Sequence, residues 1–160
     1  MIGYITSLKI GEKYIGGVMV VDKQSIPAEF KYSDPIIPTQ IQRIIYGKSL
    51  ETYLTKEIIG RTLVNSLENK PELFVTENPD LTDINDKIYC ISQVNRIEEP
   101  EKKIQENEII ITLRNVGIRI VAKEKINTDL LDIIKNMSEH IDIIEPFERL
   151  NKALDLLCRE

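Results

Sequence analysis

Three carboxylates stand where strands of the expected sheet meet their turns, and carboxylates are side chains that hold catalytic metal ions. Asp22 ends the expected strand at 14–22, Glu29 lies on the following strand, and Asp80 follows a short apolar strand at 72–76. A two-metal nuclease site gathers such oxygen atoms around ions about 4 Å apart. If the fold brought these three side chains together, the chain would be a metal-dependent hydrolase or nuclease. This is the alternative function that the sequence leaves open.

The elements that would position these carboxylates follow a familiar order. Three strands, a long helix and a further strand, within residues 1–80, resemble the ribonuclease-H-like nucleases in topology. The resemblance implies a nuclease whose carboxylates gather on the sheet. That family carries an aspartate inside its first strand, whereas the strand expected at 2–10 has no acidic residue.

The chain lacks the residues that most other kinds of catalytic site require. His140 is the only histidine, and the sequence has no C-x-x-C, G-x-S-x-G, P-loop or G-x-G-x-x-G motif. The run 78–86 is rich in Asn and Asp, but it lacks the glycine and the final glutamate of a calcium loop, so turns and a helix cap explain it better. We therefore expect no cofactor and no metal, and the sequence favours a protein that is not an enzyme.

A group of polar residues surrounds the start of a helix expected at 38–46. The candidate binding residues are Asp34, Thr39, Gln40, Arg43 and Tyr46. Free backbone N–H groups at a helix start favour an anion. A capped first turn, with Arg43 in solvent or paired to Asp34, explains the same residues. The apolar connection that contains Ile36 and Ile37 is expected to pack down and give the site a rigid base, whereas exposed isoleucines would mark a protein interface.

Composition and net charge limit the kinds of partner that we expect. The 160 residues are 42% hydrophobic and 29% charged, with a net charge of −5, as in a soluble globular protein. The acidic excess disfavours contact with a phosphate backbone, so nucleic acid is not expected as a partner. Binding of RNA or single-stranded DNA would need basic side chains on one face of the first sheet. The residues in question are Lys9, Lys13, Lys31 and Arg43.

The compartment is expected to be the cytoplasm. No apolar run approaches the roughly 20 residues that span a bilayer, and the first residues lack the pattern of a signal peptide, so no membrane contact is expected. Cys90 and Cys158 lie on apolar stretches far apart in sequence. Free, buried thiols in a reducing compartment are the simplest interpretation.

The order of the elements predicts an α+β fold in a single domain, 1–160, with a soft subdivision near 96–107. We expect a largely antiparallel sheet, made of an N-terminal three-stranded meander and later hairpin strands. It would pack against a long central helix at 49–67, with a C-terminal helical pair. The charged segment 96–107 is expected to be a solvated, mobile loop. The leading function is a non-catalytic binding or protein-interaction module, with an unidentified protein partner or small ligand. It could also be a homo-oligomer that associates through its last helix or an edge strand.

Overall fold

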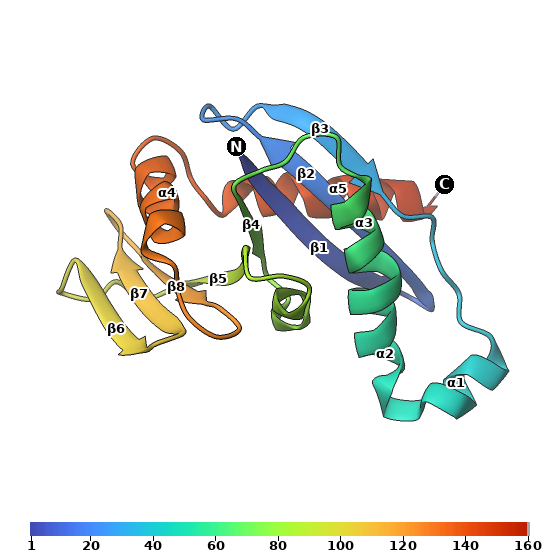
Figure 1. Cartoon of the computed structure of the whole chain (residues 1–160). Coiled ribbons are helices and arrows are strands. Elements are labelled where there is room, and N and C mark those ends of the chain that lie inside the picture. Colours follow the sequence, from blue (N-terminus) through green and yellow to red (C-terminus); the bar gives the residue numbers. More distant parts are fainter. Residues whose placement is uncertain (160) are drawn as a thin grey trace.

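A single sheet of eight strands runs through the molecule (Figure 1). The computed structural model describes residues 1–159. The strands are β1 (Ile2–Ile10), β2 (Lys13–Val21), β3 (Pro27–Tyr32), β4 (Leu73–Thr76), β5 (Ile88–Val94), β6 (Glu101–Gln105), β7 (Glu108–Thr112) and β8 (Gly117–Val121). Their order across the sheet is β3-β2-β1-β4-β5-β8-β7-β6. β4 pairs in parallel with β1 and β5, and every other pair of neighbours is antiparallel.

The first three strands form an antiparallel meander. Alternation of apolar and polar side chains and the turn residues between the strands favour it. Gly11 has φ +62° in the turn between β1 and β2, a conformation that favours glycine. β2 is buried along almost its whole length because helices cover both of its faces. A Cβ on Gly16 would lie 2.1 Å from Cγ2 of Ile59, so this glycine lets the helix approach the strand.

The helical run between β3 and β4 covers one face of the sheet with its residues 50–66, whereas its residues 40–46 stand away from the sheet (Figure 1). It consists of α1 (Gln40–Tyr46), η1 (Gly47–Ser49), α2 (Leu50–Tyr53), the π-helical η2 (Leu54–Gly60) and α3 (Arg61–Ser66). Leu54, Ile59 and Leu63 from this run pack in one core cluster with Ile5 and Val18 of the sheet. After β4, the short η3 (Pro79–Asp83) packs on the same side and leads into β5.

Two further helices cover the opposite face. α5 (Glu145–Arg159) lies on β1 and β2, where its stripe Phe147, Leu150 and Leu154 is buried. The ring of Phe147 meets the ring of Tyr4 edge-on at 4.9 Å, and the Tyr4 hydroxyl donates a hydrogen bond of 2.7 Å to the carbonyl of Ile143. α4 (Thr128–Ser138) shares this core and lies beside β7 and β8 (Figure 1). The molecule therefore has three layers.

The fold class expected from the sequence is wrong in its arrangement. The sheet is mixed, since the long helical crossover returns the chain so that β4 pairs in parallel with β1. The two C-terminal helices do not form the expected pair; α5 covers the meander, and α4 lies beside the far half of the sheet (Figure 1). Strand alternation shows which residues face a core, but it does not state which strands are neighbours.

The segment 96–107 is also different from the expected loop. Its residues 101–105 form β6, an edge strand whose side chains are all exposed. Backbone pairing with β7 needs no apolar side chain, and charged side chains such as Lys102 and Lys103 protect a sheet edge from further pairing. Cys90 and Cys158 are both free thiols. No helix within residues 1–159 combines the length and apolar character that a bilayer crossing requires.

Candidate functional site

The three parallel strands end at one edge of the sheet, which we call the carboxyl edge. It is marked by Lys9 near the end of β1, Glu77 after β4 and Asn95 after β5; these ends are staggered, since Thr76 at the end of β4 pairs with Cys90, four residues before the end of β5. The chain runs from β1 to β2 on one side and later crosses to β4 on the other side. Sheets of this kind bind ligands outside the carboxyl ends of their strands, at the point where the strand order switches. The carboxyl edge is therefore where a site is expected.

An open hollow of about 490 Å³ lies at this edge, beside the end of β5. We call it the amide hollow. The residues that line it are Gln93, Val94, Asn95, Arg96, Asn115 and Val116. The turn between β7 and β8 forms one wall and is closed by a hydrogen bond of 2.8 Å from the N–H of Leu113 to the carbonyl of Val116. A Cβ on Gly117 would lie 2.8 Å from the Asn95 carbonyl oxygen. Glycine at this position therefore lets the end of β5 approach the turn.

The lining of the amide hollow contains amide and guanidinium groups and no acidic side chain. Arg96 is exposed, as is Arg114 next to Asn115 in the turn. Neither arginine forms a salt bridge with another residue of the described chain. Side-chain amides both donate and accept hydrogen bonds, and guanidinium groups bind phosphate oxygens in a forked geometry. The chemistry of the hollow suits an anionic ligand that also carries polar edges.

The acidic side chains at the carboxyl edge lie apart from one another, and each contacts a different polar side chain. Glu77 is 3.5 Å from Nδ2 of Asn151 on α5, whose Oδ1 is buried without a hydrogen-bond partner in residues 1–159. On the other face, the hydrogen bond to Glu51 raises the pKa of Lys9, at a distance of 3.3 Å. Across residues 1–159, no three His, Cys, Asp or Glu side chains are placed to share a metal ion.

The structure does not bring together the three carboxylates of the alternative function. Asp22 accepts hydrogen bonds from the N–H groups of Gln24 and Ile26 in the turn after β2, at 2.9 and 3.0 Å. Because β2 runs antiparallel to β1, this turn lies beside the start of β1. Asp80, in η3, follows the carboxyl end of β4 and is 3.4 Å from the Thr52 hydroxyl. Asp80 therefore lies beyond the end of β4, against α2, whereas Asp22 lies beside the start of β1.

Glu29 has a structural role at the same end of the sheet as Asp22. Its carboxylate accepts hydrogen bonds from the backbone N–H groups of Glu68 and Asn69 after α3, at 3.0 and 2.8 Å. These N–H donors lower the pKa of Glu29. The residues present therefore do not fit a two-metal site.

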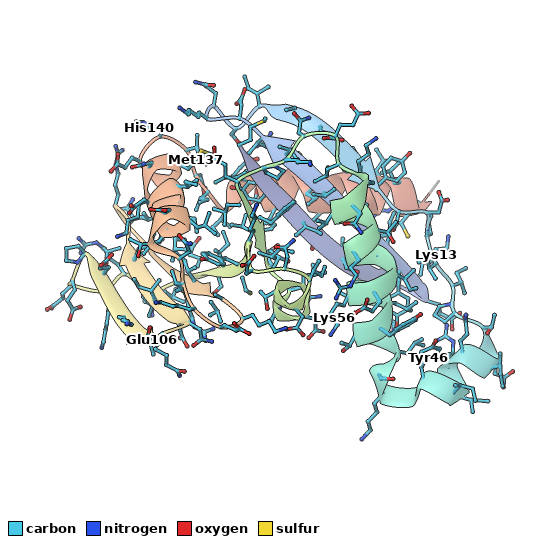
Figure 2. The ribbon with its side chains drawn as sticks, in the orientation of Figure 1. Lys13, Tyr46, Lys56, Glu106, Met137 and His140 are labelled. Atoms are coloured by element: carbon cyan, nitrogen blue, oxygen red, sulfur yellow. The ribbon has the colours of Figure 1, made fainter. Side chains whose placement is uncertain are left out.

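His140 is exposed beyond α4, apart from the helical run that carries Lys56 (Figure 2).

The candidate binding residues at the start of α1 lie along a segment that stands away from the sheet (Figure 1). Thr39 and Gln42 form a capping box at the start of the helix. Tyr46 stacks on Tyr53 at 4.7 Å, and the neighbouring Tyr46 hydroxyl raises the pKa of Tyr53. Arg43 is half-buried.

The remaining two binding candidates, Asp34 and Gln40, are exposed, and none of the five lines the amide hollow. Ile36 is half-buried and pairs through its backbone with Tyr14. The expectation that Ile37 packs down is wrong, since this side chain is 57% exposed.

The basic residues considered for a nucleic-acid face do not share one. Lys9 reaches Glu51 of α2, whereas Lys13 donates to the carbonyl of Cys158 in α5, on the opposite face. Figure 2 shows Lys13 near the C-terminal end of the fold. A basic face on the first sheet is therefore not formed by these two lysines.

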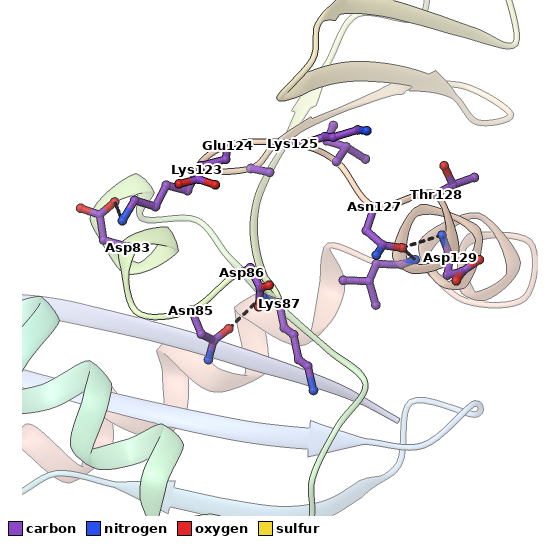
Figure 3. A pocket seen from close by; sticks show the side chains of 13 residues that line it. Asp83, Asn85, Asp86, Lys87, Lys123, Glu124, Lys125, Asn127, Thr128 and Asp129 are labelled. Carbon is purple, nitrogen blue, oxygen red and sulfur yellow. Dashed lines mark hydrogen bonds and ion pairs between the residues drawn. The ribbon is translucent and has the colours of Figure 1, made fainter.

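A larger open cavity, of about 850 Å³, lies between the segment before β5 and the segment after β8 (Figure 3). Its charged lining residues are Asp83, Asp86, Lys87, Lys123, Glu124, Lys125 and Asp129. Asp83 approaches Lys123 at 3.8 Å, and Asn127 caps α4 by accepting from the N–H of Asp129 at 2.8 Å. With four acidic and three basic side chains, this cavity does not favour an anion.

Sequence reasoning missed the amide hollow. The turn Arg114-Asn115-Val116-Gly117 is a clear hairpin signal, but its nearness to the end of β5 depends on the pairing of β5 with β8. The available signal was a concentration of amide and arginine side chains at 93–96 and 114–115.

Comparison with known proteins gives a structural likeness without a sequence relative. No family model matches the chain, and no curated protein is similar to it in sequence. The structure is similar to endonuclease V from Bacillus subtilis, with a TM-score of 0.50 and 11% identity, over 87% of this chain and 68% of that chain.

Two structures of Argonaute from Marinitoga piezophila are also similar over 84% of this chain. One contains a 5′ OH guide RNA (TM-score 0.39, 17% identity), and the other contains guide RNA and target DNA (TM-score 0.37, 13% identity). This chain spans about a quarter of the length of those Argonaute chains, 25% and 24%.

The likeness to endonuclease V corrects the expectation that nucleic acid is not a partner. The chain has a fold that a nuclease, endonuclease V, also has. The net charge of −5 is a sum over the whole chain, whereas contact with a phosphate depends on local side chains. The amide hollow has no acidic side chain despite that total. The structure thus shows a fold shared with endonuclease V, and the net charge is no ground for excluding nucleic acid.

Proposed function

We propose that this protein binds nucleic acid along the carboxyl edge of its sheet, with the amide hollow as the main contact. The observation that carries the proposal is the position of the hollow. It lies beyond the end of β5, one of the three parallel strands, in a fold that endonuclease V shares.

The chemistry of the lining agrees with such a ligand. Arg96 and Arg114 are free to contact phosphate oxygens, which provide most of the affinity for a nucleic acid. Gln93, Asn95 and Asn115 can form hydrogen bonds with the edges of unpaired bases. We therefore favour single-stranded nucleic acid, whose bases are accessible, over an intact duplex.

The test is fluorescence anisotropy of a labelled single-stranded oligonucleotide, in EDTA, with the double variant Arg96→Gln/Arg114→Gln. We expect its dissociation constant to rise about tenfold or more. Because each lost phosphate contact removes about 0.7 from the slope of log K against log salt, we also expect a shallower salt dependence. Lys23→Gln/Lys70→Gln is the control, since it removes the same charge from exposed residues at the other end of the sheet.

Two results would refute the proposal. The first is an absence of binding by the unmodified protein at low salt. The second is an equal loss of affinity in both double variants, which would show that only the net charge matters.

A metal-dependent nuclease is a second candidate, supported by the likeness to endonuclease V. Against it, β1 carries no acidic residue, and Glu77 and Asp80 are the carboxylates closest in sequence to the end of β4. Incubation of the same oligonucleotide with Mg²⁺ or Mn²⁺ tests it directly. Cleavage that is lost in the variant Glu77→Gln or Asp80→Asn would support this candidate, and intact oligonucleotide would remove it.

A further inference from the structure

The helix α1 presents its apolar side chains to solvent. It has no buried residue. Ile41, Ile44 and Ile45 are 62%, 67% and 73% exposed, and Ile37 just before the helix is also exposed. We call these four isoleucines the isoleucine face. Figure 1 shows that α1 stands away from the sheet, so no other element of the described chain covers it.

The orientation of α1 is the reverse of that of an ordinary surface helix. At about 100° per residue, its three isoleucines lie within an arc of about 100°, and Arg43 and Tyr46 lie on the other side. That other side faces the molecule, since Arg43 and Tyr46 are half-buried and Tyr46 stacks on Tyr53. An amphipathic helix normally places its apolar stripe toward the core and its charges in water.

This arrangement marks a docking surface. Four isoleucines exposed to this degree contribute on the order of 400 Å² of apolar surface, which is the size at which patches on monomers are commonly functional. The seven-residue helix is also too short to be stable by itself, because isolated helices need about 12–15 residues. A covering surface would remove the exposed isoleucines from water and hold the helix in place.

We propose that the isoleucine face docks against the same face of a second copy of this chain, in a two-fold symmetric dimer. In such an interface each patch meets itself, so a charged face would repel its copy. The isoleucine face has no charged residue; Arg43, the one charged side chain of α1, is turned toward the molecule. An uncharged, apolar patch can therefore meet its own copy without charge repulsion.

The size of the isoleucine face sets the strength of the dimer. Two faces bury on the order of 800 Å² from the isoleucines, and the flanking glutamines of α1 add to this, which is below the roughly 1,200 Å² of stable specific interfaces and in the range of weak, transient ones. We expect a dimer with a dissociation constant weaker than about 1 µM. Association should be visible as the protein concentration is raised.

Sedimentation velocity of the full chain, from about 5 to 500 µM, tests this dimer. We expect the unmodified protein to associate across this range, which brackets a weak interface, and the variant Ile44→Lys to stay monomeric. Leu156→Lys, on the exposed side of α5, is the matched control and should associate like the unmodified protein. Circular dichroism on both variants checks that the fold is kept.

Two outcomes overturn the proposal. One is an unmodified protein that stays monomeric at every concentration, which would leave the isoleucine face to a different protein. The other is a dimer that survives Ile44→Lys or is lost in Leu156→Lys, which would place the interface elsewhere. The measurement needs no nucleic acid, so its result is independent of the proposed binding function.

Discussion

Replacing Gly117 with alanine should damage the amide hollow. The new Cβ would lie 2.8 Å from the Asn95 carbonyl oxygen and 3.0 Å from Cγ2 of Val94. The carbonyl belongs to the backbone and cannot rotate aside, so the end of β5 and the β7–β8 turn must separate. Overpacking of this kind costs about 1–3 kcal/mol.

Urea unfolding measures the first consequence of Gly117→Ala. With a slope of about 2 kcal/mol per molar urea, the midpoint should fall by about 0.5–1.5 M. The second consequence is a weaker affinity for the single-stranded oligonucleotide, because Asn95 and Arg96 move with the end of β5.

Gly11→Ala is the control for this prediction. Gly11 has φ +62° and nothing within 4 Å of an added Cβ. Its alanine variant should lose about 1–2 kcal/mol through backbone strain and should bind the oligonucleotide like the unmodified protein. The reasoning is refuted if Gly117→Ala is as stable as the unmodified protein, or if both glycine variants lose the same affinity.

Two further predictions concern stability. Tyr4→Phe keeps the ring packed on Phe147 but leaves the Ile143 carbonyl without its donor, so the free energy of unfolding should fall by about 1–3 kcal/mol in urea titrations; an unchanged midpoint would show that water replaces the hydroxyl. For Glu29, the backbone N–H donors lower the pKa in the folded state, so its stabilising effect is present above the ordinary glutamate value of about 4.3 and is lost as the pH falls through the lowered pKa. The difference in unfolding midpoint between the unmodified protein and Glu29→Gln should therefore shrink below about pH 4, and a difference independent of pH would contradict this role.

The net charge of the whole chain was a poor guide to nucleic-acid binding. Residues 71–160 carry twelve basic and nineteen acidic side chains, yet Arg96 and Arg114 lie beside a hollow without an acid. A sum over the sequence does not show which charges share a surface. Only the pairing of β5 with β8 brings the two arginine segments to the same edge.

Local features of this protein were predictable from its sequence by itself. The strands of the meander, expected at 2–10, 14–22 and 26–32, are present as β1, β2 and β3 with nearly the same bounds. The spacing of Phe147, Leu150, Leu154 and Leu157 predicts one apolar stripe on the last helix; the first three are buried and Leu157 is half-buried against the same core. These features depend on neighbours within a few residues, so side-chain period and turn chemistry are sufficient.

The tertiary structure decided which distant segments meet. β4 lies beside β1 because the helical run between β3 and β4 crosses the sheet, and this crossover separates Asp80 from Asp22 and Glu29. It also leaves the isoleucines of α1 in solvent, although their spacing is that of a buried helix face. Periodicity indicates that a face is apolar. Whether a core or water lies opposite that face depends on non-local packing, which no short stretch of sequence contains.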